Sequence, residues 1–339
     1  MSKNTLEIKN LSVSFDTADG KVHAVDNLTF DLKAGEVLAI VGESGSGKSV
    51  TASAIMGLLT SGNVNLSGSI KLNEFEIIGA KDSEIRKLRG SDIAMVFQDP
   101  LSSLNPYYKI GEQIGEAYQT HHPDASKEEV RNKVIEVMKK VGIPEADKRI
   151  DSYPHEFSGG MRQRVVIAIA LINDPKVLIA DEPTTALDVT VQAQILDLMR
   201  DLQKTSNTSI ILITHDLGVV AEMVDRVLVM YAGRAVEVSE VKAIFSAPIH
   251  PYTKGLLSAV RSLDTGIREK LETIPGTPPS LLNIPQGCAF NPRCFYKSWV
   301  GEKCLTLKPE LHEIDKGLTA CHLSKTDLDR MNKNEMPVA

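Results

Sequence analysis

The chain has 339 residues, of which 42% are hydrophobic, and this allows a sizeable core and two or three domains. Its formal net charge of −6 argues against a long basic face for nucleic acid, so no nucleic-acid partner is expected. The longest apolar run covers only residues 165–172, whereas a membrane-spanning helix needs roughly 20 apolar residues, and the N-terminus lacks a signal-peptide pattern. We therefore expect a cytoplasmic protein that meets a membrane only through partners.

The first fifty residues predict strands that lead into a nucleotide-binding loop. Apolar and polar residues alternate over 5–41 around a turn at Asp19-Gly20, which indicates antiparallel strands. Residues 37–41 form a nearly all-apolar run, typical of a strand that is covered on both faces. This run enters residues 42–49, GESGSGKS, which fit the phosphate-binding pattern G-x-x-x-x-G-K-[ST] and are followed by a helical pattern. In such a setting, backbone N–H groups at a helix N-terminus cradle phosphates.

The residues of this loop divide the chemistry of nucleotide binding between them. Lys48 would neutralise the β- and γ-phosphates, and Ser49 would supply a Mg²⁺ ligand. A chance match to the pattern is the alternative, and the flanking strand and helix argue against it. The other residues predicted to bind nucleotide here are Gly42, Ser44, Gly45, Ser46, Gly47 and Val50.

The middle of the chain predicts a helical insertion in an α/β core. Residues 93–97 are typical of a strand, after which Ser126 as a cap, apolar residues at helical spacing and a stop at Gly142 indicate a helix. Apolar runs separated by helical patterns then predict a mainly parallel sheet, at residues 177–180, 210–214 and 227–230. We expect an ATP-binding core at 1–99 and 166–240, a helical part at 100–165 and a separate domain at 241–339.

An acidic pair follows the predicted strand at 177–180. Asp181 there can hold Mg²⁺, commonly through water, and Glu182 is placed to polarise the water that attacks the γ-phosphate. Taken alone, the pair would equally fit an ordinary solvated loop. The phosphate loop and the intervening sequence SGGMRQ at 158–163 favour the catalytic interpretation.

These three elements, in this order along the chain, resemble the ATP-binding cassette (ABC) family. The resemblance implies an α/β P-loop ABC nucleotide-binding domain with an antiparallel β subdomain and a helical subdomain. It also implies an ATPase whose two sites form when two cassettes sandwich ATP. A helix N-terminus preceded by small residues would then approach the partner's phosphates. The residues implied to act in trans, at the signature segment and the dimer seam, are Ser158, Gly159, Gly160, Gln163 and Asp188.

The family implies roles for three further residues. Gln98 would sense the metal and the γ-phosphate, which makes it a third Mg²⁺ residue beside Ser49 and Asp181. His215, within the sequence ITHD, would contact the γ-phosphate as a switch, and Phe15 would stack on adenine. The respective alternatives are a surface glutamine, a structural histidine and a core phenylalanine.

Beyond about residue 240 the composition of the chain and its pattern of apolar residues change. Prolines break the periodicity, and all four cysteines occur here, at Cys288, Cys294, Cys304 and Cys321. Their spacing, C-x₅-C-x₉-C-x₁₆-C, fits neither the C-x₂-C pairs of common zinc modules nor the ferredoxin patterns. In a cytosolic protein, metal ligation is favoured over disulfides. We expect a domain held by something other than a large core, and disorder in the polar last twelve residues.

The same segment resembles the C-terminal domain of oligopeptide and dipeptide importer ATPases. The matching stretches are HPYT at 250–253, GCAFNPRC at 287–294 and ACH at 320–322. The family implies a [4Fe–4S] cluster on the four cysteines, with zinc and four free thiols as the alternatives.

The resemblance extends over residues 5–323 and implies the D-type ATP-binding subunit of a dipeptide or oligopeptide importer. It implies a paralogous ATPase subunit, two transmembrane permease subunits and an extracytoplasmic peptide-binding protein as partners, with the subunit peripheral at the cytoplasmic face of the cell membrane. An importer ATPase for nickel or another small solute is an alternative, because the cassette reads ATP and not cargo. A soluble ABC ATPase of repair or translation usually carries two phosphate loops, and one is present here.

Overall fold

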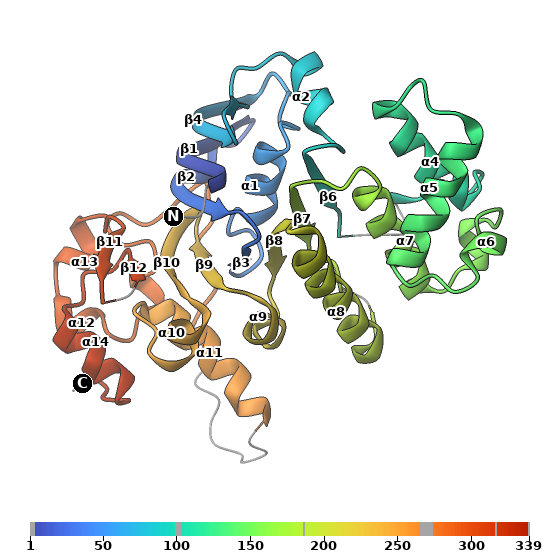
Figure 1. Ribbon diagram of the computed structural model, residues 1–339. Helices are drawn as coiled ribbons and strands as arrows, with labels where there is room; N and C mark the ends of the chain where they lie inside the picture. The colour runs from blue at the N-terminus through green and yellow to red at the C-terminus, as the bar shows by residue number, and fades with distance from the viewer. Residues whose placement is uncertain (1–3, 99–102, 186, 265–273, 316, 338–339) are drawn as a thin grey trace.

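The computed structural model in Figure 1 describes residues 4–98, 103–185, 187–264, 274–315 and 317–337. Within them lie two β-sheets, a group of helices to one side and a C-terminal segment on the opposite side. Asp99 and Pro100, at the predicted entrance to the helical part, lie outside the described residues.

The first sheet is antiparallel and has the strand order β2-β1-β4-β5. Its first two strands pair along a long hairpin, from Asn4 opposite Lys33 to Thr17 opposite Gly20, so the predicted antiparallel strands and their turn are confirmed. The strands are β1 (Asn4–Thr17), β2 (Gly20–Lys33), β4 (Val64–Leu72) and β5 (Phe75–Glu76).

The second sheet has the order β11-β12-β10-β9-β3-β8-β7-β6. From β9 to β6 all neighbours are parallel, which confirms the predicted mainly parallel sheet, while β10, β12 and β11 continue it with antiparallel pairing. The strands are β3 (Val37–Val41), β6 (Ile93–Val96), β7 (Val177–Asp181), β8 (Ser209–Thr214), β9 (Arg226–Tyr231), β10 (Arg234–Glu240), β11 (His312–Ile314) and β12 (Gly317–Thr319).

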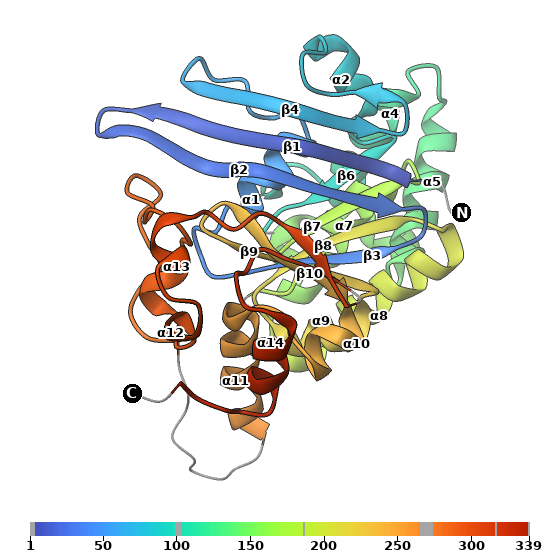
Figure 2. The same cartoon turned by 90° about the vertical axis from the view of Figure 1, so that its left-hand side faces the viewer.

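Strand β3 is covered on both faces, as its apolar sequence predicted. Val37, Ala39 and Val41 contribute to a core shared with the helices, whereas Leu38 and Ile40 contribute to a core shared with the antiparallel sheet and α1 (Lys48–Ile55). Figure 2 shows the antiparallel sheet stacked over the parallel one. The strand that carries the phosphate loop is therefore fixed from both sides.

The helical part stands to one side of the sheets, in green in Figure 1. Ser126 caps α5 by accepting a hydrogen bond from the N–H of Glu129 at 3.2 Å, as the sequence predicted. Among the described residues, no helix is both long and apolar enough to cross a bilayer. The helices up to the end of the parallel strands are α2 (Asp82–Leu88), α4 (Ile110–His121), α5 (Lys127–Lys140), α6 (Ala146–Arg149), the 3₁₀ turn η1 (Pro154–Glu156), α7 (Gly159–Leu171), α8 (Val189–Ser206) and α9 (Leu217–Met223).

The C-terminal segment shares a sheet with the rest of the chain. Because Val238 of β10 pairs with Leu318 of β12, the main sheet runs across the predicted boundary at residue 240. The segment also has a small core of its own, which includes Leu328 and Met331 of α14. The expected disorder is therefore wrong for residues 328–332, where two apolar side chains three residues apart hold a helix. The helical elements are α10 (Val241–Ser246), α11 (Pro251–Asp264), η2 (Asn291–Arg293), α12 (Lys297–Val300), α13 (Lys303–Thr306) and α14 (Lys325–Asn332).

Candidate active site

The phosphate loop joins the end of β3 to the start of α1. Gly47 precedes the helix with φ at 102°, and a Cβ there would lie 2.4 Å from the carbonyl oxygen of Ala24. Gly45 also has a left-handed backbone, with φ at 77°. Side chains would strain both positions, so the glycines of the motif are required by the backbone path as well as by access to phosphate.

Lys48 lies within this loop and is only 7% exposed. Its Nζ donates hydrogen bonds to the carbonyl oxygens of Gly42 at 2.7 Å and Glu43 at 3.0 Å. Burial lowers the pKa of Lys48, and the nearby carboxylates of Glu182 and Asp181 oppose that change. The ammonium group is thus held by the loop's own carbonyls, at the place where the sequence predicts phosphate.

Asp181 ends β7 beside the loop and is 6% exposed. The Ser49 hydroxyl hydrogen-bonds its carboxylate, whereas Oδ1 is buried and has no hydrogen-bond partner in the described part of the chain. Burial raises the pKa of Asp181, and the bond from Ser49 opposes that rise. A buried carboxylate oxygen without a partner, next to a hydroxyl, fits the oxygen ligands that Mg²⁺ prefers.

The Glu182 carboxylate gathers three side chains from three loops. Oε2 accepts hydrogen bonds from Gln98 Nε2 at 2.9 Å and from the Thr185 hydroxyl at 3.0 Å. His215 Nδ1 lies 3.2 Å from Oε1. Glu182 is largely buried, with 17% of its side chain exposed against 67% for His215, so the histidine is the more exposed partner.

The three predicted catalytic residues therefore lie together, although the sequence separates them by up to 117 positions between 98 and 215. Thr185 belongs to the same group and was not predicted. Thr185 follows Glu182 by three residues, a spacing typical of a tight turn, and this spacing would have suggested the contact. Glu182 itself has a left-handed backbone conformation, with φ at 48°.

The segment expected to act in trans forms the exposed N-terminus of α7. Ser158 caps this helix by accepting from the N–H of Met161 at 3.4 Å, and Ser158 and Gly159 are both exposed. Asp188 is exposed as well and caps α8 by accepting from the N–H of Val191 at 3.0 Å. Free N–H groups at such a helix start favour an anion.

Two residues of that segment are also packed within the chain. Gln163 is 1% exposed, and its expected part in contact in trans stays a prediction. A Cβ on Gly160 would come within 2.5 Å of Val191 Cγ1, so this glycine is needed for the packing of α7 against α8. The N-terminus of α7 is therefore the accessible part, and Gly160 and Gln163 lie behind it.

Phe15 lies on β1 between Val22 of β2 and Val64 of β4. Its ring is half-buried and packs partly against the core shared by the two sheets. Both interpretations of this residue, adenine stacking and core packing, are compatible with a half-buried ring, and stacking stays a prediction.

The four cysteines are free and line one small cavity in the C-terminal segment. Cys288 and Cys304 are also joined by a backbone hydrogen bond of 3.0 Å. Burial raises the pKa of Cys294 to about 12 and that of Cys304 to about 11, so these thiols are protonated at neutral pH unless a metal displaces the proton. Among the described residues, no three His, Cys, Asp or Glu side chains are placed to hold a single metal ion.

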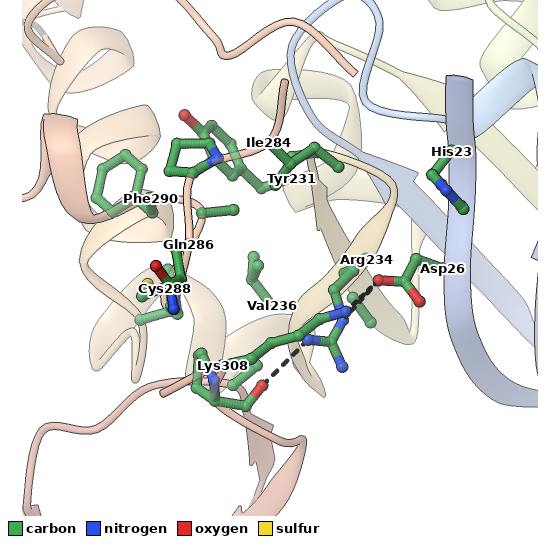
Figure 3. Close-up of a pocket in the computed structure, with 18 of the residues that line it drawn as sticks. His23, Asp26, Tyr231, Arg234, Val236, Ile284, Gln286, Cys288, Phe290 and Lys308 are labelled. Carbon is green, nitrogen blue, oxygen red and sulfur yellow. Dashed lines mark hydrogen bonds and ion pairs between the residues drawn. The ribbon is translucent and has the colours of Figure 1, made fainter. Parts of the chain in front are cut away.

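A larger cavity, of about 530 Å³, lies between β2, the β9–β10 hairpin and the C-terminal segment (Figure 3). The side chains of Arg234 and Lys308 extend toward Asp26 at one end, and Tyr231 and Phe290 line the other. No residue of the phosphate loop lines it. It is therefore distinct from the nucleotide site.

Comparison with known proteins places these features in a family. The model described as ABC transporter matches residues 25–185, and the one described as Oligopeptide/dipeptide transporter, C-terminal region matches residues 236–304. The Oligopeptide transport ATP-binding protein OppD of Escherichia coli K12 is 53% identical over 317 residues, covering 93% of this chain and 92% of that protein. The Dipeptide transport ATP-binding protein DppD of Bacillus subtilis is 52% identical, covering 92% and 94%.

Solved structures agree with this placement. A dimeric post-hydrolysis state of the ATP-binding cassette MJ0796 bound to ADP and Pi has a TM-score of 0.63 and 28% identity, covering 70% of this chain and 98% of that one. A cassette of the cbiONQ ABC transporter complex from Clostridium perfringens has a TM-score of 0.61 and 31% identity, covering 72% and 91%.

The contact between Gly160 and Val191 predicts opposite outcomes for neighbouring substitutions. Gly160→Ala should destabilise the protein by about 1–3 kcal/mol because the new methyl group overpacks the contact with Val191. Gly159→Ala should leave stability unchanged or raise it slightly, because no atom of the described residues lies within 4 Å of its Cβ position. Denaturant unfolding measures both, and Val191→Ala in the Gly160→Ala background should restore stability. Equal effects at the two glycines would contradict the packing argument.

Proposed function

Because the chain belongs to the ABC transporter family, and within it to the ATP-binding proteins of peptide transport, we propose that it powers the uptake of dipeptides or oligopeptides through an ABC importer by hydrolysing ATP. The observation that carries this proposal is the union, in one chain, of an ATPase cassette with the oligopeptide/dipeptide transporter C-terminal region. Relatives named for oligopeptide and dipeptide transport match the chain over more than nine-tenths of its length.

The geometry supports a division of labour in hydrolysis. The phosphate loop and Lys48 bind the triphosphate, and Glu182 accepts the proton of the attacking water. Gln98 and His215 hold the Glu182 carboxylate in position through the contacts described above. Mg²⁺ bound at Ser49 and Asp181 would neutralise charge on the phosphates.

A second cassette would complete each site. The exposed N-terminus of α7, with Ser158 and Gly159, would bind the γ-phosphate held by the partner, and Asp188 would line the seam between them. The dimer of the related cassette MJ0796 supports this arrangement. We propose that the partner is a paralogous ATPase subunit, and that the pair docks at the cytoplasmic face of the membrane on two permease subunits served by an extracytoplasmic peptide-binding protein.

Replacing the carboxylate of Glu182 should separate binding from catalysis. Glu182→Gln keeps the shape of the side chain but loses the base, so ATP turnover should fall at least about 100-fold while ATP still binds. Steady-state ATPase assays on the assembled complex and equilibrium ATP binding check this. Lys48→Ala is the contrasting control, because it should lose ATP binding itself. Near-normal turnover by Glu182→Gln would remove Glu182 from the catalytic role.

We propose further that the four cysteines hold a [4Fe–4S] cluster with a structural role. The four thiols line one cavity, so a single group bound there could contact all of them. In a [4Fe–4S] cluster the ligands are four cysteine thiolates, which is the number present. A bound cluster would supply folding free energy to a segment whose own core is small.

Metal analysis distinguishes the cluster from its alternatives. Protein purified without oxygen should be brown and contain about four irons and four sulfides per chain. Cys304→Ser should bleach it and make the segment beyond residue 270 sensitive to protease, while ATP binding shows that the cassette remains folded. Stoichiometric zinc without iron would replace the cluster by a zinc site, and neither metal with an intact segment would leave four free thiols.

Uptake by living cells tests the cargo. Cells that lack this chain should take up labelled di- and tripeptides at least about tenfold more slowly, and the wild-type chain but not Glu182→Gln should restore uptake, because hydrolysis drives transport. Labelled nickel uptake is measured in parallel. Loss of nickel uptake with normal peptide uptake would overturn the peptide assignment in favour of a small-solute importer, and loss of neither would place the ATPase outside solute import.

A further inference from the structure

The cysteine-bearing loop of the C-terminal segment reaches the phosphate loop directly. Arg293, between Cys288 and Cys294, forms a two-pronged ion pair with Glu43: Nη1 lies 2.6 Å from Oε2, and Nη2 lies 3.0 Å from Oε1. Glu43 is the second residue of the phosphate-binding motif, 250 positions earlier in the chain. Paired bonds of this kind are strong and fix the relative orientation of both groups.

Arg293 is also held by contacts with residues other than Glu43. It is only 5% exposed, and its Nε donates to the carbonyl oxygen of Pro275 at 2.8 Å. Nη1 also approaches the Tyr231 hydroxyl at 3.4 Å. The Glu43 carboxylate raises the pKa of Arg293, so the guanidinium is permanently charged, and removal of Glu43 would leave a buried charge without its partner.

The main chain of Glu43 is held at both of its polar groups. Its N–H donates to the Tyr252 hydroxyl of α11 at 2.9 Å, and its carbonyl oxygen accepts from Lys48 Nζ at 3.0 Å. Tyr252 packs on Tyr231, with ring centroids 4.7 Å apart. Tyr252 and Arg293 thus hold Glu43, and the carbonyl oxygen of Glu43 in turn holds the ammonium group of Lys48.

We propose that Arg293 is a positioning residue for the ATPase reaction, which holds Glu43 and through it the phosphate loop and Lys48 in the geometry that binds ATP. The C-terminal segment is then part of the nucleotide site's support, in addition to any role it has at the transporter. Coupling of this kind is reciprocal, so ATP bound in the loop stabilises the docked segment.

The test compares two ion pairs that both join the C-terminal segment to the cassette. Arg293→Lys keeps the charge but cannot form both bonds, and Glu43→Gln removes the charge from a side chain that is partly exposed. Lys308→Met is the matched control, since Lys308 pairs with Asp26 of β2 and not with the phosphate loop. Equilibrium ATP binding, the KM and kcat of the assembled complex, and unfolding by denaturant are measured for each.

The two loop-pair variants should raise the Kd and KM for ATP about tenfold, a change of about 1.4 kcal/mol. Their kcat should stay within about twofold, because Glu182, Gln98 and His215 make no contact with Arg293 in the described structure. The double variant should be no worse than the worse single one, because both substitutions remove the same interaction. Lys308→Met should leave Kd, KM and kcat at their wild-type values.

A folded Arg293→Lys protein with wild-type ATP affinity, whatever its stability, would show that the pair only fastens the segment and would overturn the inference. If Arg293→Lys does not fold, Glu43→Gln decides by the same criterion. The inference rests on the ATPase function proposed above. Wild-type protein that fails to bind ATP would defeat that function, whereas wild-type protein that binds ATP no more tightly than the variants would defeat only the inference about Arg293.

Discussion

The register of four parallel strands decides which functional groups meet. Val96 of β6 lies opposite Ala180 of β7, so Gln98 and Glu182, each two residues further on, emerge side by side at the same edge. Asp181 lies opposite Ile213 of β8, which delivers His215 to the other side of Glu182. Val41 of β3 lies opposite Thr214, and the phosphate loop begins at the next residue. A slip of one residue in any of these pairs would turn the catalytic side chains to opposite faces of the sheet.

The site brings together charges that a stable core would avoid. Lys48 and Asp181 are both nearly buried. Burial lowers the pKa of Lys48 and raises the pKa of Asp181, so it favours the neutral form of each. Glu182 occupies a left-handed backbone conformation that costs about 1 kcal/mol or more for a residue with a side chain. Such groups persist because the sheet and the two cores around β3 over-determine their positions. A bound triphosphate would pair with the ammonium group of Lys48, and its cation would pair with the carboxylate of Asp181.

The sequence was a good guide wherever a function is carried by neighbours in the chain. The phosphate loop, the acidic strand end and the helix N-terminus after Ser158 are short patterns with a local physical cause, whereas Gln98 and His215 were expected from the family resemblance. It was a poor guide wherever partners are remote. Nothing near Glu43 indicates Arg293, and nothing near Gly160 indicates Val191, because both contacts depend on how the chain closes on itself. The burial of Gln163 and the final helix were missed for a related reason: burial depends on the packed fold, and a polar stretch with two apolar residues does not predict it.

The pairing of Glu43 with Arg293 also sets an order of events during synthesis. The phosphate loop leaves the ribosome 250 residues before its anchor, and at 5–20 residues per second that interval is roughly 12–50 s. The parallel strands β6, β7, β8 and β9 and the catalytic side chains of Gln98, Glu182 and His215 are translated within it. The parallel part of the sheet can therefore form while the phosphate loop still lacks its contact with Arg293. If Arg293 supports the phosphate loop as proposed, a nascent chain gains its full affinity for nucleotide only after the C-terminal segment has been made and has docked.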